Sequence, residues 1–156
     1  VDAVTGRGTG IDDAGRARKV AVIDAALARN APEPRDPLGV LAAVGGLEIA
    51  VLVGAIVEAG LAGIPVVLDG FISTSAALVA VALAPRLGPR LIAGHRSTEP
   101  GHRIVLDHLG LTPILELDLR LGEASGAALA MGVIVAAVAI RDEMATFDSA
   151  GIDGPA

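Results

Sequence analysis

The sequence predicts an α/β fold in which a parallel β-sheet is flanked by helices, in a Rossmann-like three-layer arrangement. Short β-branched runs begin near residues 65, 90 and 112, and a helical pattern lies between each pair. This spacing is typical of right-handed βαβ units. Because 53% of the residues are apolar and only 1% are aromatic, the core must consist mainly of small aliphatic side chains.

The first part of the chain is predicted to be helical. A glycine loop at residues 6–10 runs into a helix that begins with acidic residues, which suit the helix dipole. Asp36 followed by Pro37 is a favourable N-cap and first-turn pair. Helices are therefore expected at residues 13–29, 37–44 and 47–59.

Strands and helices then alternate. The β-branched run 64–68 is typical of a buried parallel strand. Further strands are expected at residues 90–93 and, more weakly, 113–116. Ser73 or Thr74 is expected to cap a helix that runs to residue 83, and Ser97 or Thr98 a helix at 99–109. After a last helix at 125–144, residues 1–148 form one predicted domain and 149–156 a flexible tail.

Composition and charge argue against several functions. A net charge of −6 with almost no aromatic residues disfavours nucleic acid as a partner. The absence of cysteine excludes disulfides and thiolate metal sites. His95, His102 and His108 lack the i, i+3 or i+4 spacing of a helical metal site, so no metal is expected. His102 and His108 are expected on a solvated helix face, whereas His95 ends a strand.

One apolar segment allows two interpretations. Residues 124–140 are uncharged and reach the lower limit of a membrane-spanning length. Because the run is mostly alanine and contains glycine and serine, its insertion energy would be weak. A buried core helix is therefore favoured and no membrane association is expected, while a membrane-associated helix remains the alternative.

Ligands of open α/β sheets lie beyond the carboxyl ends of the strands. Asp69 follows the first strand, where it can bind a ribose hydroxyl or cap the next helix. The free amides of the glycine loop can hold a phosphate, helped by Arg7 or Lys19. A plain turn is the alternative interpretation of this loop, because it matches neither a Walker A sequence nor the full dinucleotide-binding pattern.

Glu123 lies on a glycine-flanked turn just before the long apolar segment. Partial burial at the start of a buried helix would make this carboxylate a competent general base. The alternative is a carboxylate that only stabilises the helix dipole, which is worth roughly 0.3–1 kcal/mol.

Several segments occur in order along the chain: Pro-Arg-Asp at 34–36, Val-Gly-Gly at 44–46, Gly-Ile-Pro-Val-Val-Leu-Asp-Gly-Phe at 63–71, Ser-Ala-Ala at 75–77, Gly-His-Arg-Ser at 94–97 and Leu-Arg-Leu-Gly-Glu-Ala-Ser-Gly-Ala-Ala at 119–128. The last is the most specific. Together they resemble the nicotinate-nucleotide:dimethylbenzimidazole phosphoribosyltransferase family.

The resemblance implies a cytoplasmic, homodimeric glycosyltransferase with a parallel-sheet α/β domain and a smaller accessory domain. The enzyme moves the phosphoribosyl group of nicotinate mononucleotide onto 5,6-dimethylbenzimidazole, giving α-ribazole 5′-phosphate and nicotinate, in the synthesis of the cobalamin lower ligand. No cofactor is implied. The general base is the glutamate of the Leu-Gly-Glu motif, here Glu123. The implied substrate-binding residues are Gly6, Gly8, Lys19, Asp69, Gly70, Ser97 and Leu121.

Family members are considerably longer, and their N-terminal half supplies much of the benzimidazole pocket. The sequence is therefore expected to be a C-terminal portion that lacks the N-terminal part of the family fold, with the other half as a possible partner. Weak or no turnover is expected from this portion alone. A non-catalytic nucleotide-binding, phosphate-binding or assembly domain is the alternative function.

Overall fold

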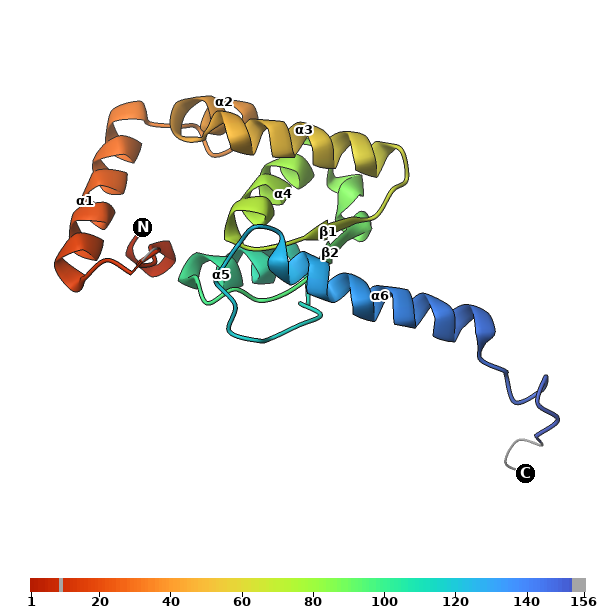
Figure 1. Ribbon diagram of the computed structural model, residues 1–156. Coiled ribbons are helices and arrows are strands. Elements are labelled where there is room, and N and C mark those ends of the chain that lie inside the picture. The colour runs from red at the N-terminus through yellow and green to blue at the C-terminus, as the bar shows by residue number, and fades with distance from the viewer. Residues whose placement is uncertain (9, 153–156) are drawn as a thin grey trace.

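The computed structural model describes residues 1–8 and 10–152, which form a mostly helical α/β fold around a small parallel sheet (Figure 1). The sheet consists of β1 (Val66–Leu68) and β2 (Leu91–Ala93), paired in parallel over their whole length. Both strands lie within the predicted runs, so the α/β class and the parallel pairing are confirmed.

The chain crosses from β1 to β2 through α4 (Phe71–Leu83) and the short 3-10 helix η2 (Pro85–Arg90). Helix α4 begins earlier than expected, and neither Ser73 nor Thr74 caps it. Their hydroxyls instead donate to the carbonyl of Gly70, at 3.0 and 2.8 Å. The correction has a local cause, since hydroxyls in the first turn of a helix readily bond back to a carbonyl three or four residues earlier.

The expected strand at 113–116 is not a strand in the structure. The segment contributes one isolated parallel bridge, between His95 and Leu115, and the Ile114 amide donates to the Ala93 carbonyl at 2.9 Å. Pro113 has no amide proton to extend this ladder. The segment therefore lies along β2 and holds its carboxyl end without becoming a third strand.

Three helices precede the sheet: α1 (Asp13–Asn30), α2 (Pro37–Val44) and α3 (Leu47–Leu61). Asp36 caps α2 as predicted, because its side chain accepts from the Gly39 amide at 2.9 Å. Helix α3 lies across α4, whose small residues permit close packing (Figure 1). The core between α3, α4, η2 and the two strands contains Val53, Ile56, Leu68, Ala76, Ala77, Ala80, Leu87 and Leu91.

Two helices follow the sheet, α5 (Pro100–Leu109) and α6 (Ser125–Glu143). Helix α6 extends away from the rest of the fold (Figure 1). The expectation of a buried core helix is wrong, because only Gly126 and Ala130 are buried in it. Only the first turns of α6 reach the sheet, so its later apolar side chains are exposed to solvent. By length and composition alone, α6 could cross a membrane, the one helix among the described residues that could.

Candidate active site

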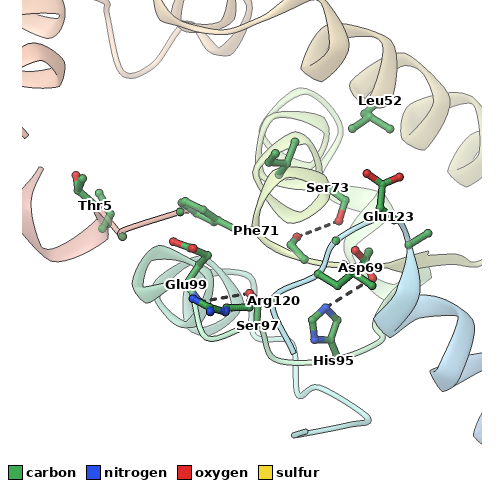
Figure 2. Close-up of a pocket in the computed structure, with 18 of the residues that line it drawn as sticks. Thr5, Leu52, Asp69, Phe71, Ser73, His95, Ser97, Glu99, Arg120 and Glu123 are labelled. Carbon is green, nitrogen blue, oxygen red and sulfur yellow. Dashed lines mark hydrogen bonds and ion pairs between the residues drawn. The ribbon is translucent and has the colours of Figure 1, made fainter. Parts of the chain in front are cut away.

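An open cavity of about 740 Å³ lies beyond the carboxyl ends of β1 and β2. The first turn of α4 and the segment before α6 supply much of its wall (Figure 2). Every residue that the resemblance implied for the site lines this cavity. These residues are Gly6, Gly8, Lys19, Asp69, Gly70, Ser97, Leu121 and Glu123. The structure thus brings together segments that are far apart in the sequence.

Asp69 directly follows β1 and fixes the beginning of α6. Its Oδ1 accepts hydrogen bonds from the amides of Gly126 and Ala127, at 2.8 and 3.0 Å. The sequence left open whether Asp69 caps the next helix or binds a ligand. The helix that it caps is not the next one, α4, but one that begins 56 residues further along the chain. Its other oxygen, Oδ2, makes no hydrogen bond to the described residues and can accept one from a ligand.

His95 follows β2 and lies beside this carboxylate. Its Nε2 is 3.6 Å from Oδ1 of Asp69 (Figure 2), and the side chain is only 2% exposed. Neither ring nitrogen has a hydrogen-bond partner among the described residues. Gly126 is required beside the ring, because a Cβ there would overlap it. Three groups therefore pack tightly against one another on the inner wall of the cavity: Asp69, His95 and the start of α6.

His102 corrects a prediction, because it is completely buried rather than on a solvated face. Its Nδ1 accepts from the Ser97 amide at 2.9 Å, and its Nε2 lies 3.0 Å from Thr74 Oγ1. Burial and, to a smaller extent, the nearby His95 ring lower the pKa of His102 to about 4, while the Asp69 carboxylate opposes the shift. The side chain is therefore neutral near pH 7. His108 is exposed, as predicted.

The glycine loop lies at one side of the cavity. Gly8 has a φ of +57°, which favours glycine, and Lys19 Nζ reaches the Gly6 carbonyl at 3.4 Å. Of the two cations that the sequence offered, only Lys19 lines the cavity, since Arg7 forms an ion pair with Asp13. The loop and α1 therefore place two glycine residues and the Lys19 cation on the cavity wall, where an anionic ligand group can bind.

Glu123 lies on an unusual turn at the cavity. Gly122, Glu123 and Ala124 have consecutive φ values of +74°, +56° and +58°. Residues other than glycine adopt this left-handed region at a cost, and such residues concentrate at functional sites. Glu123 is exposed, so the described residues do not provide the partial burial that the sequence led us to expect.

Sequence reasoning did not assign several other residues that line the cavity. They are Thr5, Phe71, Ser73, Glu99 and Arg120. Arg120 lies in the same motif as Leu121 and Glu123, and this position in the sequence could have identified it as a site residue. Phe71 approaches Gly101 so closely that a Cβ there would overlap its ring. Only the three-dimensional structure identifies this contact. Among the described residues, no group of three or more metal-ligating side chains gathers.

Comparison with known proteins gives one consistent answer. A family model described as a phosphoribosyltransferase, DBI_PRT, matches residues 1–152. Nicotinate-nucleotide–dimethylbenzimidazole phosphoribosyltransferase from Desulforudis audaxviator is 59% identical over 152 residues, which are 97% of this chain and 43% of that protein. The protein of the same name from Geobacter sulfurreducens is 57% identical, with the same coverage.

A solved structure is similar as well. The crystal structure of CobT from Thermus thermophilus superposes with a TM-score of 0.92 at 49% sequence identity. The match covers 99% of this chain and 46% of that one. The chain thus spans less than half the length of the relatives that it matches.

Proposed function

Because the chain belongs to the DBI_PRT family of phosphoribosyltransferases, we propose that it carries the phosphoribosyl-binding site and the general base for transfer from nicotinate mononucleotide to 5,6-dimethylbenzimidazole. The proposed products are α-ribazole 5′-phosphate and nicotinate, in the synthesis of the cobalamin lower ligand. The observation that carries the proposal is that all eight predicted site residues line one cavity.

In the proposed reaction, one ring nitrogen of the benzimidazole attacks the anomeric carbon of nicotinate mononucleotide. The bond from that carbon to the pyridinium nitrogen breaks, and its electron pair returns to that nitrogen. Nicotinate then leaves with a neutral pyridine ring. The other benzimidazole nitrogen loses its proton to the Glu123 carboxylate. A base positioned in this way typically contributes about 10²–10⁴ in rate.

The residues that line the cavity also support the substrate-binding roles that the resemblance implies. Lys19 and the loop at Gly6 and Gly8 supply a positive charge and conformational freedom for the phosphate. Oδ2 of Asp69 is a hydrogen-bond acceptor for a ribose hydroxyl, because Oδ1 is already held by the start of α6. The Ser97 hydroxyl accepts from the Glu99 amide at 3.3 Å, which leaves its own proton for the ligand.

The acceptor side of the site is the less complete part. Glu123 and Leu121 are both exposed, and an aromatic acceptor binds best where apolar walls enclose it. We therefore propose that the benzimidazole pocket, the homodimer and the larger Rossmann-like three-layer sheet involve protein beyond these 156 residues or a second copy. The exposed apolar side chains of α6 support this proposal.

Calorimetric titration of the purified, folded chain with nicotinate mononucleotide tests the proposal, with nicotinate and ribose 5-phosphate titrated separately. We expect the mononucleotide and ribose 5-phosphate to bind and nicotinate alone to bind more weakly. No binding by a folded chain would contradict a phosphoribosyl site formed by these residues. Binding without turnover on addition of 5,6-dimethylbenzimidazole is expected both for the proposed function and for the alternative of a binding domain, because this portion alone is expected to turn over weakly or not at all.

A further inference from the structure

His102 is the centre of a buried hydrogen-bond chain between the two turns that form the inner wall of the cavity. One turn contains Ser97, whose amide donates to Nδ1 of His102. The other contains Gly70, whose carbonyl accepts from Thr74 Oγ1 at 2.8 Å. His102 and Thr74 are both completely buried, and neither lines the cavity. Any effect of these two residues on a ligand must therefore pass through the turns that they join.

The hydrogen bonds that connect Ser97, His102, Thr74 and Gly70 all run in one direction. A main-chain amide can only donate, so Nδ1 of His102 accepts and the neutral ring carries its proton on Nε2. The Nε2 proton is donated to Thr74 Oγ1, and the Thr74 hydroxyl proton goes to the Gly70 carbonyl. A satisfied chain of this kind is rigid, whereas the loss of one member leaves a buried polar group unpaired.

At one end of this series of hydrogen bonds lies Ser97, which lines the cavity. The Ser97 amide is held by His102, and the Ser97 hydroxyl oxygen is held by the Glu99 amide. Both the main chain and the side chain of Ser97 are thus fixed, and Ser97 lines the cavity. A donor that is already fixed loses less conformational entropy when a ligand binds.

We propose that His102 is a positioning residue that fixes the Ser97 hydroxyl as a hydrogen-bond donor to the phosphoribosyl group. The identity of this ligand rests on the proposed function, whereas the link between His102 and Ser97 does not. A neutral imidazole suits the role because a rigid ring offers an acceptor on one edge and a donor on the other. Thr74 then sets the orientation of the ring by accepting from Nε2.

Thr74→Val tests the link, because it removes the acceptor for Nε2 while keeping the shape of the side chain. The buried Nε2–H is then left without an acceptor, which favours rotation of the ring or transfer of its proton to Nδ1, and either change weakens the hydrogen bond from Ser97. We expect hydrogen exchange at the Ser97 amide to become about tenfold faster and the Kd for nicotinate mononucleotide to rise about tenfold. Thr74→Ser is the matched control, since it keeps the hydroxyl and removes only the methyl group.

NMR of the ¹⁵N-labelled imidazole reads the tautomer directly. We expect a protonated Nε2 and an unprotonated Nδ1 in the wild type and in Thr74→Ser, and a changed ring spectrum in Thr74→Val. Unchanged Ser97 exchange in Thr74→Val, or equal effects of the two variants, would overturn the proposal, because packing alone would then explain them. Failure of wild-type protein to bind the mononucleotide would contradict the proposed function, while the exchange and ring measurements would still decide the link.

Discussion

The carboxylate of Asp69 holds the amide of Gly126 at 2.8 Å and thereby joins the end of β1 to the beginning of α6. A carboxylate at a helix N-terminus is favoured both by the free amides and by the helix dipole. The same contact places the strained turn that carries Glu123 immediately beside the cavity wall. Asp69 is therefore both a structural cap and a candidate ligand-binding group.

Asp69→Ala should lower the free energy of unfolding by about 1–3 kcal/mol, because two amides at the start of α6 lose their acceptor. It should also weaken binding of nicotinate mononucleotide, measured by calorimetry. Asp36→Ala is the matched control, since Asp36 caps α2 in the same way and does not line the cavity. The control should lose about 1 kcal/mol and bind normally. Equal binding by both variants would contradict a ligand-binding role for Asp69.

Gly126→Ala should be destabilising, because the added Cβ would overlap the buried His95 ring. Overpacking of this kind costs about 1–3 kcal/mol. Gly132→Ala in the same helix has open space around the new Cβ and should gain roughly 0.5–1 kcal/mol from helix propensity. Urea unfolding of the two variants measures the contrast. Similar changes in both would show that His95 does not pack against the start of α6.

Ala124→Gly should stabilise the fold by roughly 1 kcal/mol, because glycine adopts a φ of +58° without the cost that alanine incurs. Ala128→Gly, inside α6, should instead destabilise by roughly 0.5–1 kcal/mol. Thermal unfolding of both variants tests the difference in sign. If Ala124→Gly destabilised the protein as much as Ala128→Gly, the result would contradict the left-handed conformation of Ala124 before α6.

The buried neutral His102 predicts a dependence of stability on pH. Its pKa is lowered from 6.5 to about 4 in the folded protein, so between these values only the unfolded chain takes up the proton. The free energy of unfolding should therefore fall as the pH drops from about 6.5 to about 4, by up to about 3 kcal/mol.

Urea unfolding over that pH range, for wild type, His102→Asn and His108→Gln, isolates this contribution. The part of the slope due to His102 should disappear in His102→Asn. It should persist in His108→Gln, because His108 is exposed on the same helix. A slope that survives intact in His102→Asn would show that other groups cause it.

Glu123→Gln should abolish most of the chemistry while leaving substrate binding intact. The test uses a chimaera in which this chain replaces the matching residues of the Desulforudis audaxviator relative, to which it is 59% identical. We expect kcat to fall by about 10²–10⁴ with little change in the Kd for nicotinate mononucleotide. Glu116→Gln, at an exposed ion pair with Arg96, is the control and should retain activity. Unchanged kcat in Glu123→Gln would exclude it as the base.

The sequence determined those features that depend on local chemistry. The Asp36-Pro37 pair predicted the first residue of α2, because capping and a fixed φ act within one turn. The β-branched runs predicted both strands and their parallel pairing, since a helix between two strands is typical of the crossover that parallel strands require. The glycine loop and the motif around Glu123 predicted residues that the fold then brought to one cavity.

The tertiary structure alone decided which distant groups meet. His102 has the sequence surroundings of a solvated helix residue, but the packing of α5 against α4 buries it against Thr74. The cap that Asp69 provides belongs to a helix 56 residues further along, which no local pattern specifies. The apolar run of α6 predicted burial, yet burial requires a partner surface, and the described residues cover only its first turns. Local propensities act within a few residues, whereas contacts between remote segments are fixed only when the whole chain packs.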